Sequence, residues 1–324
     1  MKTLVISNMM RCKNKQSFFA LHQIQTKIKK IDPSIDIEFH ILWDSDPSHH
    51  EKVDDPYWGN LIDTQIQTIY PYTKSFFKEY VRNFYNDVNV DRFDAFPAIY
   101  FVLMAQYLRR VKLYDYYLIY DDDILINDDF SHILDKVINN VPVLIAEPMN
   151  MNCDKVFFQK IVSMFGQEFL ENYKQRNPQL LGFNAGFQGI DLSVYDNFLS
   201  VDRFNFLLSL FEYKSIYNEN GEEIWGDERF FIDTQQQSFF SLSNVVLSKK
   251  EPHILDINEY FVVPNFGTHP VYGPIDSEDE LGGWGIGLKS KLTHFIGHTR
   301  GRGKPKIFLE KVDEYLKNEG FLNE

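Results

Sequence analysis

The sequence predicts an α/β protein with helices flanking a sheet. Residues 1–150 alternate strand-like and helix-like segments, a pattern typical of βαβ units and a parallel sheet. The chain has 324 residues, of which 44% are hydrophobic, so it can bury a large core without disulfides. This length allows one large domain or two small ones, and we expect one large domain over residues 1–324, with halves at 1–150 and 151–324.

In the first half, the apolar pattern predicts strands at residues 2–7, 35–43, 114–120 and 141–146. Apolar residues at steps of three and four predict a helix from about residue 18 that stops before Pro33. A second helix is expected at 98–110, because Pro97 suits a first helical turn. Residues 57–85 are expected to be helical in parts.

The second half is less regular. Its periodicity predicts helices at 154–176, 202–217 and 227–240, and a strand at 182–190. A turn is expected at 218–221 and a long surface loop at 264–287, where Gly and Pro cluster.

Composition excludes several classes of protein. The 33 Lys+Arg and 46 Asp+Glu give a net charge of −13, which argues against a surface that coats nucleic acid or anionic lipid. The most apolar stretch, 98–108, is well short of the roughly 20 residues of a transmembrane helix. Near the N-terminus the apolar run is only Leu4–Ile6, whereas a signal peptide needs about 7–15 apolar residues. The only cysteines, Cys12 and Cys153, form no CxxC pair. We expect a cytoplasmic protein with no transmembrane segment; its oligomeric state is left open.

An acidic triplet, Asp121-Asp122-Asp123, directly follows the strand expected at 114–120. In open α/β sheets the ligand crevice lies outside the carboxyl ends of the strands. In an extended segment Asp121 and Asp123 would point the same way, so both could bind one divalent cation. The alternative is a solvated acidic turn, although the apolar run at 124–126 that follows favours a functional site.

A second segment, HFIGHTRGRGKP at 294–305, combines an imidazole with cationic side chains among glycines. His294 could complete the coordination of a metal, and Arg300, Arg302 and Lys304 could neutralise a diphosphate. The alternative is a basic surface loop with a packed histidine.

Four segments together resemble the metal-dependent nucleotide-sugar glycosyltransferases of the GT-A fold, most closely glycosyltransferase family 8, the glycogenin-like and galactosyltransferase group. The four segments are the strand with its acidic triplet at 114–126, FNAGF at 183–187, GDERF at 226–230, and the segment at 294–305. The resemblance implies a Rossmann-like mixed sheet, with a nucleotide-binding half at 1–150 and an acceptor-side half at 151–324.

The resemblance also implies a set of ligands. Asp121, Asp123 and His294 would bind Mn²⁺ or Mg²⁺, and the imidazole shifts the preference towards Mn²⁺. For the nucleotide sugar, the resemblance implies Asp121 or Asp122 near the ribose and Asn184 and Gly186 at the sugar. Lys304 would bind the diphosphate, with Arg300 and Arg302 as rivals because four extra residues precede Lys304.

The implied reaction moves a hexosyl or pentosyl group from a nucleotide sugar, with UDP as the expected nucleotide, to a glycan or another hydroxyl acceptor. Asp227 and Glu228 stand where the family usually has Asp-Gln. Family resemblance implies retention of anomeric configuration. Trp225–Glu228 also resembles the acidic segment of inverting enzymes of this fold, in which an acid deprotonates the acceptor. Both outcomes stay open.

Residues at the ends of the first two strands are further candidates for the nucleotide. Ser7 and Asn8 follow the first strand and Asp44 follows the second, and both strands would end in the same crevice. The alternative is that they are capping or turn residues. Two rival functions also stay open: a metal-dependent nucleotidyltransferase or phosphatase, and a catalytically inactive module that binds sugar or a cation.

Overall fold

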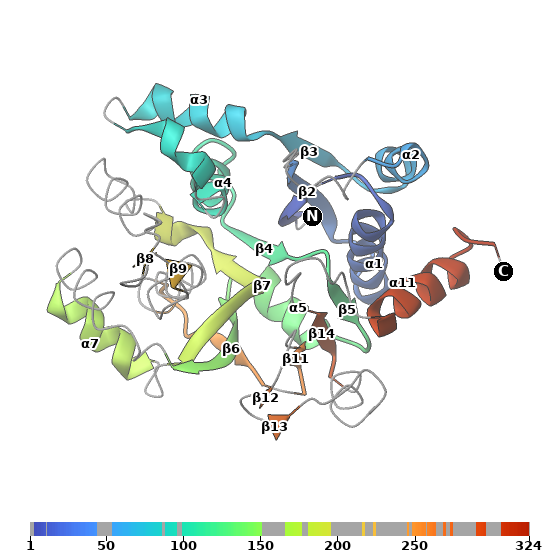
Figure 1. Ribbon diagram of the computed structural model, residues 1–324. Coiled ribbons are helices and arrows are strands. Elements are labelled where there is room, and N and C mark those ends of the chain that lie inside the picture. The colour runs from blue at the N-terminus through green and yellow to red at the C-terminus, as the bar shows by residue number, and fades with distance from the viewer. Residues whose placement is uncertain are drawn as a thin grey trace. The chain divides into compact units, whose positions relative to one another are not determined.

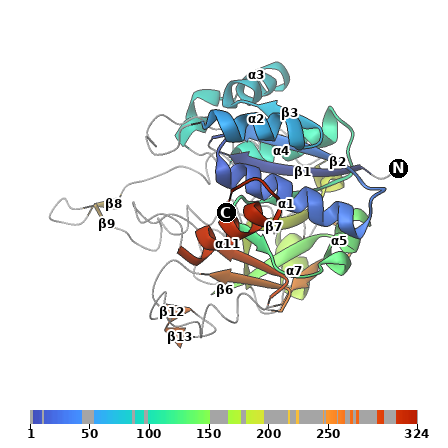
Figure 2. The same cartoon turned by 90° about the vertical axis from the view of Figure 1, so that its right-hand side faces the viewer.

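The computed structural model describes these residues: 3–10, 12–43, 54–85, 88–95, 99–150, 166–176, 181–195, 216–217, 223–224, 245, 248–256, 258–263, 268–269, 273–274, 290–295 and 306–323. Figure 1 shows the helices and strands along the chain, and Figure 2 shows them turned by 90°. The chain divides into two compact units, and each combines segments that are far apart in the sequence. The first comprises Met1–Tyr72, Leu118–Asn139 and Ile254–Glu324; the second comprises Thr73–Tyr117 and Asn140–His253.

The first unit contains a sheet whose strands run in the order β4-β1-β2-β3. The strands are β1 (Thr3–Met10), β2 (Asp36–Trp43), β3 (Ile69–Tyr72) and the Leu118–Tyr120 part of β4 (Tyr116–Tyr120). β1 pairs with β2 in parallel, and β2 pairs in parallel with β3. The parallel βαβ arrangement predicted for the start of the chain is therefore confirmed.

Helix α1 (Lys15–Ile31) connects β1 to β2 and shows why the sequence is helical there. The Asn14 side chain caps its first turn by accepting the N–H of Ser17 at 3.0 Å. Phe18, Leu21 and Ile24 follow at helical spacing and are fully buried. The helix ends at Ile31, two residues before a proline, as predicted.

The other helices of the first unit are α2 (Pro56–Gln65), α5 (Ser131–Ile138) and α11 (Lys306–Asn318). Helices α1 and α11 come from opposite ends of the chain and lie side by side (Figures 1 and 2). Phe19 of α1 meets Phe308 and Tyr315 of α11 edge to face, at 6.1 and 5.3 Å between ring centroids. Aromatic packing and the Lys15–Asp313 ion pair, at 2.6 Å, therefore connect the two helices.

A second, three-stranded sheet in the first unit has the order β11-β14-β5. Its strands are β11 (Tyr260–Val263), β14 (Leu292–Phe295) and β5 (Ile124–Ile126). β14 pairs in parallel with β11 and antiparallel with β5. Strand β5 is the continuation of the chain directly after the acidic triplet, so this small sheet brings residues near 294 to that triplet.

The described part of the second unit contains two antiparallel strand pairs and several helices. The elements described there are α3 (Lys74–Phe84), the 3-10 helix Val90–Ala95, α4 (Ile99–Arg110), β6 (Val143–Asn150), α7 (Gln167–Arg176), β7 (Leu181–Asp191), the 3-10 helix Leu192–Tyr195, β8 (Ile216–Tyr217) and β9 (Glu223–Ile224). β6 and β7 pair antiparallel, and the N–H of His253, at the start of β10 (His253–Leu255), donates to the Pro142 carbonyl at 2.8 Å. Aromatic rings hold α3 to α4, where Tyr107 meets Phe77 and Tyr80 edge to face.

Parallel and antiparallel pairs together make this a mixed α/β fold with helices beside the strands, which confirms the predicted fold class. The single domain over residues 1–324, with halves that meet at residue 150, stays a prediction. Among the helices that the structure describes, none has both the length and the apolar character needed to cross a membrane.

Two local predictions are wrong. Ile216 and Tyr217 were expected at the end of a helix, but they form β8, which pairs antiparallel with β9. Both residue types favour strands, and the cross-strand partners follow within a few residues. The loop expected at 264–287 contains a short antiparallel pair, β12 (Thr268–His269) and β13 (Gly273–Pro274). Most of these two stretches lie outside the described residues, as do the first part of the helix expected at 154–176 and the whole helix expected at 227–240. The described end of the first of these is helical, as α7.

Candidate metal centre

Strand β4 leads directly into the acidic triplet. Its apolar residues Leu118, Ile119 and Tyr120 are buried, and the strand ends at Tyr120, directly before Asp121. The triplet is a turn rather than the extended segment that the sequence analysis assumed, with Asp122 and Asp123 in the turn itself. The turn is needed because the chain leaves one sheet at Tyr120 and enters another at Ile124.

Strand pairing brings His294 to the triplet. In the antiparallel β5–β14 pair, Ile124 lies opposite His294, and Asp123 directly precedes Ile124. The backbone N–H of Phe295 donates to the Asp123 carbonyl at 3.0 Å and extends this ladder by one residue. Backbone hydrogen bonds thus place Asp123 and His294 side by side, although they are 171 positions apart in the sequence.

The three side chains predicted as metal ligands converge. His294 Nε2 lies 2.9 Å from Asp123 Oδ1 and 3.7 Å from Asp121 Oδ2. One ligand atom from each of Asp121, Asp123 and His294 lies within 4.8 Å of the other two. Asp123 and His294 are buried, and Asp121 is partly exposed, so the group opens to solvent on the side of Asp121.

The chemistry of this donor set fits a divalent cation. Two carboxylates held this close, one of them buried, repel each other strongly unless a positive charge lies between them. A divalent ion would neutralise both, and carboxylate oxygens with one imidazole nitrogen suit Mn²⁺ as well as Mg²⁺. The Tyr260 ring packs edge to face on His294, with 6.0 Å between centroids, and orients the imidazole.

Two polar residues of α1 support the turn and were not found by the sequence analysis. Gln16 Nε2 donates to the carbonyl of Asp122 at 3.2 Å. Gln23 Nε2 donates to the carbonyl of Ile124 at 3.1 Å, although Gln23 lies on the buried side of the helix. The signal in the sequence was that Gln23 directly precedes Ile24, one of the apolar residues that recur at helical spacing in α1.

Ser7 and Asn8 are buried, at 1% and 3% exposure, and both lie on β1. The sequence analysis placed them at the end of this strand, but β1 continues to Met10 because Met9 and Met10 still pair with β2. Ser7 lies opposite His40 and Asn8 opposite Ile41. Ser7 and Asn8 are therefore within the strand, three and two residues before its last residue, Met10.

The remaining candidates fall into two groups. Asn184 lies on β7 opposite Ile145, and Gly186 is buried on the same strand; both belong to the second unit. The others lie outside the described residues: Asp44, Asp227, Glu228, Arg300, Arg302 and Lys304.

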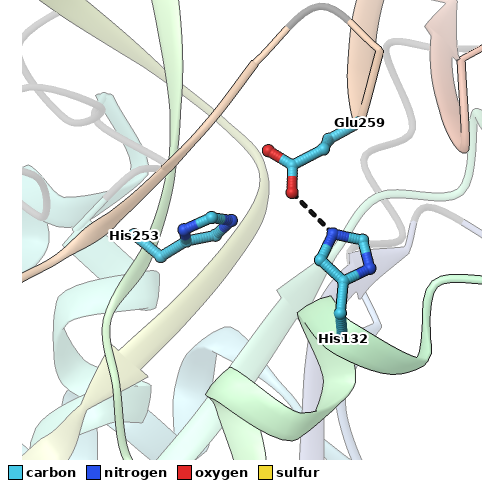
Figure 3. A group of neighbouring side chains, drawn as sticks. All are labelled: His132, His253 and Glu259. Atoms are coloured by element: carbon cyan, nitrogen blue, oxygen red, sulfur yellow. Dashed lines mark hydrogen bonds and ion pairs between the residues drawn. The ribbon is translucent and has the colours of Figure 1, made fainter.

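Figure 3 shows another set of side chains of the metal-ligating type: His132, His253 and Glu259. His132, on α5, and Glu259, just before β11, belong to the first unit and form an ion pair, with 2.6 Å between Nε2 and Oε1 (Figure 3). Glu259 Oε2 also accepts the N–H of Asp256 at 2.9 Å. His253 belongs to the second unit. In the first unit only the contact between Glu259 and the partly exposed His132 remains, and we assign no metal-binding or catalytic role to it.

Comparison with known proteins gives structural matches only. No protein-family model matches the chain, and no curated protein matches its sequence. The chain is similar in structure to the bifunctional glycosyltransferase WbbM, at 13% identity and a TM-score of 0.46, covering 96% of this chain and 50% of that one. It is also similar to an active-site mutant of LgtC, at 15% identity and a TM-score of 0.45, covering 97% and 96%. A third match is mouse xyloside xylosyltransferase 1, at 10% identity and a TM-score of 0.41, covering 90% and 97%. The chain thus spans half of the WbbM chain and nearly all of the other two.

Proposed function

We propose that this chain is a metal-dependent glycosyltransferase of the GT-A type, related to glycosyltransferase family 8. It moves a sugar from a nucleoside diphosphate sugar, with UDP as the nucleotide, to a hydroxyl group of a glycan acceptor. The observation that carries the proposal is the convergence of Asp121, Asp123 and His294 at the end of a sheet strand. Composition, with two cysteines in the whole chain, suits a cytoplasmic enzyme.

The chemistry of the donor explains the need for these groups. Breaking the bond between sugar and phosphate leaves a diphosphate whose new negative charge must be neutralised. A divalent ion between the diphosphate and the two aspartates would supply Lewis acidity at this point. Asp121 and Asp123 hold the charge that binds it, and His294 supplies a neutral nitrogen. Lys304, with Arg300 or Arg302, adds positive charge at the diphosphate.

Mn²⁺ is the preferred ion under this proposal. Mg²⁺ favours an all-oxygen shell with several waters, whereas an imidazole nitrogen raises the affinity for Mn²⁺. His294 is buried and its ring packs against Tyr260, so the imidazole is held by the fold.

The sugar side of the site is assigned by resemblance. Asp227 and Glu228 stabilise positive charge on the sugar as it leaves, or one of them acts on the acceptor hydroxyl. We favour retention of configuration, with inversion through Asp227 or Glu228 as base as the alternative. The other donor contacts proposed are Ser7, Asn8, Asp44 and Asp122 for the nucleotide, and Asn184 and Gly186 for the sugar.

The test is release of nucleoside diphosphate from a panel of sugar nucleotides with Mn²⁺, with and without glycan acceptors. We expect release with at least one UDP-sugar, and loss of it when EDTA removes the metal. Asp123→Asn and His294→Ala should each lower the rate by about 10- to 100-fold or more, because each removes a proposed ligand. Asp128→Asn is the matched control, since Asp128 belongs to the same acidic stretch but bonds at an exposed position to the N–H of Asp129.

Three results would contradict the proposal. Unchanged Mn²⁺-dependent turnover in both ligand variants would mean that the residues are not ligands. Pyrophosphate or free phosphate as the product would indicate a nucleotidyltransferase or a phosphatase. Release from no donor, with or without acceptor, would favour a catalytically inactive binding module.

A further inference from the structure

Gln23 is a polar residue in an apolar environment. It is 2% exposed, on the face of α1 that also buries Phe19, Ala20 and Ile24. A buried amide must have its hydrogen-bonding capacity satisfied, or it destabilises the fold. The contacts that satisfy Gln23 all lie on the two strands around the acidic turn.

These contacts surround the turn on both sides. Gln23 Nε2 donates to the Ile124 carbonyl at 3.1 Å and to the Tyr120 hydroxyl at 3.3 Å. Gln23 Oε1 accepts the backbone N–H of Ile126 at 2.8 Å. Tyr120 is the last residue of β4, and Ile124 and Ile126 begin and end β5. One side chain therefore connects the strand before the turn to the strand after it.

The Gln23 amide makes the hydrogen bonds to β5 that a further strand of the sheet would make. On either side of β5, the Asp123 carbonyl accepts the N–H of Phe295 in β14, and the Asn127 N–H donates to the carbonyl of Lys291, the residue just before β14. Successive residues of a strand direct their backbone N–H and C=O groups to opposite sides, so those of Ile124 and Ile126 point away from β14. Gln23 supplies there one donor and one acceptor, as a residue of a third strand would.

Gln16 extends this support to the turn itself. It lies seven residues, or about two helical turns, before Gln23, so the two amides share one side of α1. Gln16 Nε2 donates to the Asp122 carbonyl at 3.2 Å. The carbonyl of the next residue, Asp123, accepts from Phe295. The backbone between the two candidate ligands is thus held by α1 on one side and by β14 on the other.

We propose that Gln16 and Gln23 are positioning residues of the metal centre, which fix the separation of the Asp121 and Asp123 carboxylates through the backbone of the turn. This inference rests on the proposed function, because it requires a divalent ion at these carboxylates. Neither glutamine touches the ion or the substrate. Their effect is to present the two carboxylates already at binding distance, so that little ordering is left for the metal to impose.

The experiment measures Mn²⁺ affinity of the whole chain directly, by the EPR signal of free Mn²⁺ in a titration without nucleotide. The variants are Gln16→Ala, which removes one bond from a partly buried position, and Gln23→Met, which keeps the length of the side chain and removes all three bonds. We expect each to weaken Mn²⁺ binding by about 10-fold, the lower end of the effect of outer-sphere groups at metal sites.

Gln106→Met is the matched control. Gln106 is also a fully buried glutamine, on α4 in the second unit, and its amide donates to the Tyr85 hydroxyl. This variant should lower the unfolding temperature and leave the Mn²⁺ dissociation constant within about twofold of wild type. The control separates loss of a buried hydrogen bond, which lowers stability, from loss of positioning, which lowers affinity.

Two results would overturn the inference, and they are distinguishable. If the wild type binds Mn²⁺ and Gln16→Ala and Gln23→Met bind it equally well, the proposed function stands and the positioning role is wrong. If the wild type binds no Mn²⁺, the proposed function fails and the inference fails with it. Gln16→Ala decides the question by itself where Gln23→Met does not fold, since Gln16 contributes little to the core.

Discussion

Asn127 connects the end of β5 to the start of β14 and so keeps His294 in register. Its Nδ2 donates to the Ser290 carbonyl at 3.0 Å and to the Thr293 hydroxyl at 2.7 Å. Its backbone N–H donates to the Lys291 carbonyl at 2.8 Å. Three hydrogen bonds from one residue thus hold the strand that carries the histidine.

Asn127→Ala should lower the free energy of unfolding by about 1–3 kcal/mol, because it removes two side-chain hydrogen bonds to buried groups. The measurement is urea denaturation followed by circular dichroism. Asn139→Ala is the control: Asn139 donates from an exposed position to the Asp135 carbonyl, and its loss should cost below about 0.5 kcal/mol. Equal effects from the two substitutions would mean that Asn127 does not stabilise the β5–β14 pair.

The role that we propose for Glu228 at the sugar can be tested by a single substitution. If its carboxylate is the nucleophile or the base, Glu228→Gln should lower kcat by about 100-fold or more. If the glutamine usual in family 8 performs the same task, activity stays near wild type. The kinetic comparison at saturating donor decides between these roles, and near-full activity in the variant would exclude both the nucleophile and the base.

The sequence allowed Asp121, Asp123 and His294 to be named as candidate ligands, because strand ends and family-like motifs are local signals, and the structure brings these three side chains together. It did not allow the turn to be predicted, since whether Asp122 and Asp123 continue a strand depends on the change of sheet at Tyr120. Gln16 and Gln23 were missed for a related reason. A glutamine on an amphipathic helix usually faces solvent, and its burial here depends on tertiary contacts with β5.

At the scale of elements, α1 was the most predictable part of the chain. Its apolar spacing and its stop before Pro33 are contained within one segment, and the observed helix Lys15–Ile31 agrees. Strands β5 and β14 are only three and four residues long, too short for a period to be read. The pairing of β5 with β14 is a contact between residues about 170 positions apart, and a local sequence pattern cannot predict it.

The contact between α1 and α11 should depend on pH through His22. His22 Nδ1 lies 2.9 Å from the Tyr315 hydroxyl, and its ring packs on Phe18 and Phe321. Burial lowers the pKa of His22 below its ordinary value of 6.5, an effect that the charge of Glu319 partly opposes. Since the unfolded chain takes up this proton more readily, the contribution to stability is complete above pH 6.5 and is lost as pH falls below it.

We therefore expect the free energy of unfolding of the wild type to decrease between about pH 7.5 and pH 5 more than that of His22→Gln. Comparing the two proteins removes the contribution of the other titrating groups. Urea denaturation at each pH gives the values. The same pH dependence in both proteins would show that His22 does not titrate across this range in a way that affects folding.

At the scale of the whole molecule, the net charge of −13 conceals an uneven distribution. Seven acids lie between Asp115 and Asp135 with no Lys or Arg among them, whereas residues 300–306 contain four basic residues and no acid. From composition alone, the negative charge is explained by solubility, and it argues against a protein that coats nucleic acid. The local concentration of acids, together with His294 beside them, is the observation on which the proposed cation and the proposed anionic donor rest.

The most direct test of this account is a crystal soaked with Mn²⁺ and UDP, with anomalous scattering recorded at the manganese edge. The account predicts one strong anomalous peak within about 2.5 Å of carboxylate oxygens of Asp121 and Asp123 and of His294 Nε2, with the UDP diphosphate on its open side. A peak bound by other residues, or no peak at these three in crystals that hold UDP, would contradict it.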